Sequence, residues 1–139
     1  MSAISASQVK ELREKTGLGL MDCKKALEEA NGDIDLAIEE LRKTSGIKAS
    51  KKSGRSAADG LIGITNKDKD FFMIEVNCET DFVARDDSYI NFTKETLDTY
   101  SNNPSHSLEQ LLESGVEDNR EKLVQKLGEN IVVRRLAKS

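Results

Sequence analysis

The stretch Phe71-Phe72-Met73-Ile74-Glu75-Val76-Asn77-Cys78 decides the fold class, because its apolar and polar residues alternate with a period of two. Such alternation is typical of a half-buried β-strand. The predicted buried face consists of Phe72, Ile74, Val76 and Cys78. Residues 61–65 predict a second strand, and the polar residues 66–70 predict the turn that joins the two.

The residues that follow predict helices and a third strand. Segments 88–100, 107–113 and 117–127 have helical patterns, and Gly128 is placed to end the last of them. Residues 130–136 then predict a strand with Ile131 and Val133 on one face. Segment 59–139 is therefore expected to be an α+β subdomain, in which a small antiparallel three-stranded sheet packs with helices.

The first third of the chain has a helical rather than a strand period. Ser5 and Gln8 form a predicted capping box, and Gly17 supplies a stop signal. Two more short amphipathic helices follow, at 21–30 and after Asp33. Residues 1–44 thus predict a three-helix bundle, and the basic segment 45–58 predicts a linker or a weak helix.

The residue inventory argues against an enzyme. The single histidine of the 139-residue chain, His106, lies in a polar loop where we expect it to be solvent-exposed. Neither a nucleophile motif nor a phosphate-binding glycine loop is present. Segment 66–77 lacks the glycine and the glutamate that a calcium loop needs. We therefore expect a non-enzyme without a metal or cofactor of its own.

Composition suggests an ordinary cytoplasmic protein. The formal net charge is −4, and no apolar run approaches the length that spans a membrane. Cys23 and Cys78 lie outside any metal or redox spacing, so both are expected to be reduced and buried. The start of the sequence lacks the pattern of a signal peptide. We expect a cytoplasmic location and no membrane partner.

Two segments are not fully explained by packing. Leu18 and Met21 lie in the glycine-punctuated stretch 17–21, where they either form a contact surface or close the end of the bundle. In segment 79–85, Thr80 is placed to cap a short helix. Phe82 either packs inward there or forms a binding tip.

Two long motifs resemble the elongation factor Ts family. Segment 12–27, LREKTGLGLMDCKKAL, matches the N-terminal signature of the family, and segment 75–85, EVNCETDFVAR, matches its second signature. Segments 30–34 and 128–131 fit as well. The resemblance implies a bundle of the ubiquitin-associated type over 1–44 and the first core subdomain of the family over 59–139.

The resemblance also implies a function in translation and protein biosynthesis. Family members are guanine-nucleotide exchange factors that bind elongation factor Tu, and GDP, GTP and Mg²⁺ belong to that partner. The implied contacts near the magnesium site are Thr80, Asp81, Phe82 and Val83, with Leu127 as a possible neighbour. The implied contacts of the bundle with the partner's G domain are Leu12, Leu18, Leu20, Met21 and Lys24.

The chain departs from the family in length. Members usually continue into a second core subdomain with a helical hairpin through which they dimerise, so weaker binding and reduced exchange are expected here. The oligomeric state stays open. The main alternative is a general interaction module, in which the bundle binds some other protein, for example a ubiquitin-like one. A nucleic-acid contact by the basic residues of 45–58 is less favoured, because no aromatic residue lies among them.

Overall fold

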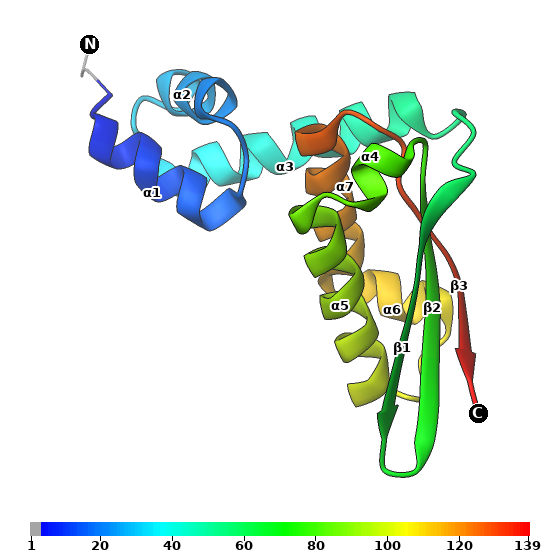
Figure 1. Ribbon diagram of the computed structural model, residues 1–139. Coiled ribbons are helices and arrows are strands. Elements are labelled where there is room, and N and C mark those ends of the chain that lie inside the picture. Colours follow the sequence, from blue (N-terminus) through cyan, green and yellow to red (C-terminus); the bar gives the residue numbers. More distant parts are fainter. Residues whose placement is uncertain (1–3) are drawn as a thin grey trace.

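The sheet is present in the computed structural model, which describes residues 4–139. Strands β1 (Asp59–Lys67) and β2 (Asp70–Cys78) form an antiparallel hairpin. Asp68 and Lys69 take left-handed conformations in the two-residue turn, which suits the twist of the flanking strands. Strand β3 (Val132–Lys138) pairs antiparallel with β2, so the order is β1-β2-β3 (Figure 1). The predicted α+β class is confirmed.

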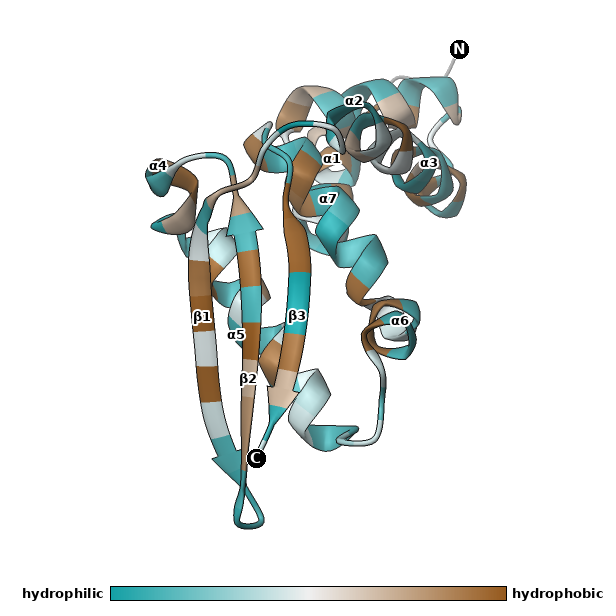
Figure 2. Cartoon of the chain, turned by 90° about the vertical axis from the view of Figure 1, so that its right-hand side faces the viewer, coloured by the Kyte–Doolittle hydropathy of each residue, from teal (hydrophilic) through white to brown (hydrophobic). Residues whose placement is uncertain are grey.

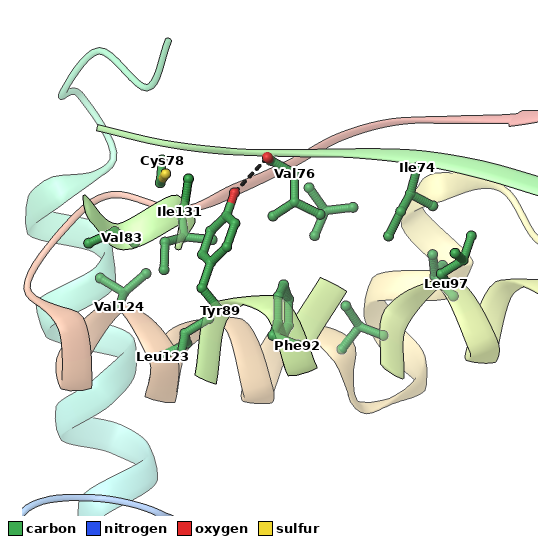
Figure 3. Packing of buried hydrophobic residues seen from close by; sticks show 14 of the residues in the cluster. Ile74, Val76, Cys78, Val83, Tyr89, Phe92, Leu97, Leu123, Val124 and Ile131 are labelled. Atoms are coloured by element: carbon green, nitrogen blue, oxygen red, sulfur yellow. Dashed lines mark hydrogen bonds between the residues drawn. The ribbon is translucent and has the colours of Figure 1, made fainter. Parts of the chain in front are cut away.

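Alternation along β2 separates a buried face from an open one, as predicted. Phe72, Ile74, Val76 and Cys78 are all at most 2% exposed. Helices cover this face, and Tyr89 points from helix α5 (Asp87–Asn102) toward β2 (Figure 3). Its hydroxyl donates a hydrogen bond of 2.6 Å to the carbonyl oxygen of Val76. The phenol therefore satisfies a strand carbonyl inside the core.

The remaining helices of the core follow the predicted order. Helix α6 (Leu108–Leu111) is shorter than expected, because a wide turn, η1 (Leu112–Val116), follows it and contains Gly115 at φ 97°. Helix α7 (Glu117–Leu127) ends at Gly128, as predicted. His106 is half-buried rather than solvent-exposed, and its backbone N–H closes a turn onto the Asn103 carbonyl at 3.0 Å.

Three helices form the N-terminal bundle around a separate apolar core. They are α1 (Ala6–Thr16), α2 (Leu20–Glu29) and α3 (Ile34–Lys52). The capping box of Ser5 and Gln8 is confirmed, and Gly17 ends α1 with a φ of 70°. The likeness of this bundle to the ubiquitin-associated type stays a prediction.

Helix α3 joins the bundle to the core. It continues into segment 45–58, which was expected as a linker or a weak helix, and ends at Lys52. Its second half packs against α7 through small residues, and a Cβ on Gly46 would lie 2.6 Å from a carboxylate oxygen of Glu121. Ser45, which is buried, donates a hydrogen bond to Gln125 of α7. The small residues allow the two helices to approach closely.

Candidate functional site

A one-turn helix, α4 (Asp81–Ala84), follows β2 at the end of the sheet (Figures 1 and 2). Thr80 caps it, as predicted, because its hydroxyl oxygen accepts a hydrogen bond of 3.3 Å from the Val83 N–H. Val83 and Ala84 are buried and belong to the core cluster of the α+β subdomain. One side of this turn is thus fixed to the protein interior.

Glu129 clamps the start of the turn from the neighbouring strand connection. Its carboxylate accepts hydrogen bonds from the backbone N–H groups of Glu79 and Thr80, at 3.1 Å and 3.0 Å. It also accepts one from the Thr80 hydroxyl at 2.7 Å. Hydrogen bonds to an ionised acceptor are stronger than neutral ones, so this carboxylate is the main polar anchor of the turn.

Glu79 completes the anchor in the opposite direction. Its carboxylate accepts a hydrogen bond of 2.6 Å from the Asn130 N–H and lies 3.6 Å from the Arg55 guanidinium. The Asn130 amide in turn donates to the Arg55 carbonyl at 2.8 Å. The end of β2, the segment before β3 and the segment after α3 are therefore tied together beneath α4.

Sequence reasoning missed this clamp. Because β2 and β3 are antiparallel neighbours, the end of one must lie beside the start of the other, and this topology could have placed Glu79 near Glu129. Nothing in the residue pattern indicated that each carboxylate would accept hydrogen bonds from the other segment. The pairing depends on the three-dimensional arrangement of segments about 50 residues apart.

Phe82 projects away from the protein and is 82% exposed. The alternative in which its ring packs inward is therefore excluded, and Val83 takes the inward position instead. Asp81 and Arg85 are exposed beside it and form an ion pair at 3.7 Å. An exposed pair of this kind contributes little stability. The turn thus presents an aromatic ring and a carboxylate to the surroundings.

The predicted contacts on the bundle divide into two groups. Leu20 and Met21 are 54% and 74% exposed at the start of α2, and Lys24 is exposed one turn further on. Leu12 and Leu18 instead lie in the bundle core, at 0% and 3% exposure. As placed here, these two side chains offer no surface to a partner, and their contact role stays a prediction.

Hydrogen bonds around Thr16 explain why Leu18 is buried. The Thr16 hydroxyl donates to the Leu12 carbonyl at 2.8 Å and accepts from the Leu18 N–H at 3.3 Å. The loop therefore turns back over the end of the bundle, and Leu18 closes it. The alternatives left open for Leu18 and Met21 are thus resolved differently for each residue: Leu18 packs, and Met21 is free to make a contact.

Leu127 is half-buried and packs against the core cluster. It lies at the end of α7, two residues before Glu129, and so belongs to the end of the molecule that carries α4. Its partial exposure leaves part of the side chain at the surface. A role as a neighbour in the same contact stays a prediction.

The exposed residues at α4 and at the start of α2 offer apolar and charged groups for binding. Burial raises the pKa of both the Cys23 and the Cys78 thiols, which keeps them protonated near neutral pH. Within residues 4–139, no group of three or more His, Cys, Asp or Glu side chains is arranged to hold a metal ion. No helix of that range is both long and apolar enough to cross a membrane.

These features define an α+β protein in which the helical bundle and the core subdomain each present exposed apolar side chains at the surface. The family model described as elongation factor TS matches residues 79–139. The chain is 54% identical over 140 residues to elongation factor Ts from Marinobacter nauticus, covering 99% of this chain and 48% of that protein. It is 55% identical to the protein of the same name from Hahella chejuensis, covering 97% and 48%.

A third relative, elongation factor Ts from Klebsiella pneumoniae, is 51% identical over 99% of this chain and 48% of its own length. The chain belongs to the elongation factor Ts family. It spans about half the length of the curated relatives it matches.

Proposed function

We propose that this chain is a translation elongation factor that binds elongation factor Tu in its GDP form and promotes release of the nucleotide. The single observation that carries the proposal is the exposed Phe82 ring on a turn that Thr80, Val83 and Glu129 hold in place. A large apolar side chain that is both solvent-exposed and rigidly supported is suited to insertion into another protein. Family membership supports the identity of that partner.

In the proposed mechanism, α4 approaches the magnesium side of the partner's nucleotide pocket. Mg²⁺ bridges the phosphates of a bound nucleotide and neutralises their charge. Phe82 inserts between partner side chains, and the Asp81 carboxylate disturbs the groups that hold the metal. The partner conformation with displaced metal ligands then binds this chain better and GDP worse. Linkage requires the two effects to be equal in free energy, so GDP weakens binding of the chain by the same ratio.

The bundle is proposed to supply a second contact, on a helix of the partner's G domain. Leu20 and Met21 provide exposed apolar surface for it, and Lys24 provides a positive charge. Such a contact stabilises the complex irrespective of the state of the magnesium site. In this proposal α4 binds the conformation with displaced metal ligands better than the GDP-bound one, whereas the bundle binds both equally well. The two contacts together account for exchange without a side chain that reacts chemically.

The test is the release of fluorescently labelled GDP from elongation factor Tu, followed after addition of excess unlabelled GDP. Saturating chain is expected to accelerate release, and Phe82→Ala is expected to remove most of that acceleration. Phe71→Ala is the matched control, because Phe71 is also exposed, at 56%, but lies at the far end of β2. The proposal fails if the unmodified chain changes neither the release rate nor the elution position of the partner in gel filtration.

A further inference from the structure

Helix α3 belongs to both apolar cores of the chain. Leu41, in its first half, packs in the bundle core, whereas Ala49, near its end, packs in the core of the α+β subdomain. Figure 1 shows α3 extending from the bundle to α7. Within residues 4–139, neither α1 nor α2 packs broadly against α5 or α7. The position of the bundle relative to the subdomain therefore depends on α3 and on the contacts that support it.

Helix α3 has a weak point between these two residues. Ser45 and Gly46 lie side by side in its interior, and sharp bends of helices occur preferentially at such pairs of glycine and serine. Glycine also loses more conformational freedom in a helix than any other residue. The helix alone is therefore not expected to fix the angle between the bundle and the subdomain.

Gln125 of α7 bridges this weak point. Its side-chain carbonyl oxygen accepts a hydrogen bond from the buried Ser45 hydroxyl, and its amide nitrogen donates one of 3.3 Å to the Asp22 carboxylate on α2. The other carboxylate oxygen of Asp22 lies 3.9 Å from the Lys48 ammonium on α3. One side chain of α7 is thus bonded to both α2 and α3.

Close packing does not support this link. A hollow of about 160 Å³ lies beside it, lined in part by Asp22, Leu41, Thr44, Lys48 and Gln125. A second hollow, of about 270 Å³, lies between the end of α1 and helices α5 and α7. Units joined through a small polar interface move relative to each other unless specific contacts hold them. Hydrogen bonds rather than apolar burial therefore hold α2 against α7.

We infer that Gln125 is a positioning residue, which fixes the angle between the bundle and the α+β subdomain. It thereby fixes the placement of Met21 relative to Phe82. Asp22, which Gln125 bonds, directly follows Met21 in the sequence. Gln125 also lies on the helix that leads to Glu129, whose carboxylate anchors the turn that carries Phe82. The end of α7 thus orients both exposed apolar surfaces.

The consequence for binding rests on the proposed function, whereas the angle itself does not. Two contacts with one partner form together only where their spacing matches the partner. A chain that holds this spacing in advance loses less conformational freedom on binding than one that bends at Gly46. The second contact then forms at a high effective concentration once the first has formed.

Residual dipolar couplings of the backbone amides of the whole chain test the angle directly. In the unmodified chain, one alignment tensor is expected to describe α1, α2 and the sheet. In Gln125→Ala, the alignment of α1 and α2 is expected to fall by roughly a fifth or more relative to the sheet, as it does for a swing of some tens of degrees. Equal alignment of both parts in this variant overturns the inference.

Lys126→Ala is the matched control on the same helix. The Lys126 ammonium donates a hydrogen bond of 2.8 Å to the Ser88 hydroxyl on α5, inside the subdomain. Its removal is expected to leave one tensor for the whole chain. A bundle that loosens equally in Lys126→Ala and in Gln125→Ala contradicts a specific role for Gln125.

An exchange of the two polar groups tests the direct bond between α7 and α2. Gln125→Glu alone places a second carboxylate against that of Asp22, and their repulsion is expected to loosen the bundle. The double variant Asp22→Asn, Gln125→Glu restores the hydrogen bond with donor and acceptor exchanged, and the new carboxylate can still accept from Ser45. It is expected to regain a single tensor. A double variant as loose as Gln125→Glu overturns the inference.

The release of labelled GDP from elongation factor Tu tests the consequence for binding. Gln125→Ala is expected to raise the half-saturating concentration about 3- to 10-fold and to leave the maximal rate unchanged. The double variant is expected to return it to the original value. An unchanged half-saturating concentration in a loosened variant overturns the role in binding. If the unmodified chain does not promote release, the proposed function fails, while the dipolar couplings still decide whether Gln125 fixes the angle.

Discussion

Glu129 holds Thr80 through both its backbone N–H, at 3.0 Å, and its hydroxyl, at 2.7 Å, across 49 residues of sequence. The same carboxylate accepts the Glu79 N–H, so three donors converge on one side chain. Phe82 therefore projects from a turn whose first residues are fixed to the segment before β3. The rigidity of the exposed ring comes from this contact more than from the single turn of helix itself.

Removal of the clamp is expected to destabilise the α+β subdomain. Glu129→Ala leaves three donors without their acceptor, and we expect a loss of about 1–3 kcal/mol in the free energy of unfolding. Glu129→Gln retains one carbonyl oxygen as acceptor and should lose roughly half as much. Urea unfolding followed by circular dichroism measures both. A loss below about 0.5 kcal/mol for Glu129→Ala would show that water replaces the carboxylate without cost.

Phe82 and Val83 are expected to respond oppositely to truncation, although they are adjacent. Phe82→Ala removes an exposed ring, so the free energy of unfolding should stay within about 0.5 kcal/mol of its original value. Val83→Ala removes buried methyl groups and should cost about 1–2.5 kcal/mol. The same urea titration compares them. If Phe82→Ala destabilises the chain as much as Val83→Ala, the ring packs inward in solution.

This contrast shows what the sequence could and could not predict. The period of β2 extends over eight residues, which is long enough to assign Phe72, Ile74, Val76 and Cys78 to the buried face. Helix α4 has only four residues, so no period distinguishes Phe82 from Val83, and packing against the core decides.

The sequence left the length of α3 open between a linker and a weak helix after residue 44, for a different physical reason. Its second half packs through Ser45, Gly46 and Ala49, which are too small or too polar to form an apolar stripe. Close approach of two helix backbones, rather than burial of large side chains, stabilises that contact. The family motif does not distinguish contact residues from core residues, which is why Leu12 and Leu18 were expected as contacts although both are buried.

High pH is expected to destabilise the chain through its two buried thiols. Burial raises the folded pKa of Cys23 and Cys78, whereas an unfolded thiol titrates near about 8.5. Above that pH the unfolded chain loses protons that the folded chain retains, so the free energy of unfolding falls as pH rises. The slope is at most about 1.4 kcal/mol per pH unit for each thiol.

Urea titrations at intervals between pH 7 and pH 10 measure this slope. The double variant Cys23→Ala, Cys78→Ala should show a lower stability at pH 7 but a flatter dependence on pH. An unchanged slope in the double variant would assign the effect to other groups. Tyr89 adds a decrease in the same direction above about pH 10, because burial raises its pKa as well.

Gly60→Ala is expected to disrupt the end of the sheet nearest α4. Gly60 has a φ of 151°, and a Cβ there would lie 2.1 Å from the Val76 carbonyl oxygen. The obstructing atom belongs to the backbone of β2 and cannot rotate away, so we expect a loss of about 3 kcal/mol or more. Gly54→Ala is the control, because its Cβ would meet nothing within 4 Å. Equal thermal stabilities of the two variants would contradict the close approach.

Truncation of Met21 is expected to separate the roles of the bundle and of α4 in the proposed exchange reaction. Met21 is 74% exposed and contributes, under that proposal, to a contact made equally before and after GDP leaves. Loss of such a contact weakens binding of the chain without slowing GDP release from the bound complex. Met21→Ala should therefore raise the half-saturating concentration about 5- to 30-fold and leave the maximal rate of GDP release unchanged.

Phe82→Ala should show the reverse pattern, with a lower maximal rate, because its ring acts only on the conformation that releases GDP. Both values come from release rates measured over a range of chain concentrations, with Ile47→Ala as the exposed control on α3. Since the two surfaces are well separated, the double variant should combine both changes additively in free energy. If the maximal rate falls as much for Met21→Ala as for Phe82→Ala, the bundle also drives the release step. The assignment of binding to the bundle and of GDP release to α4 is then wrong.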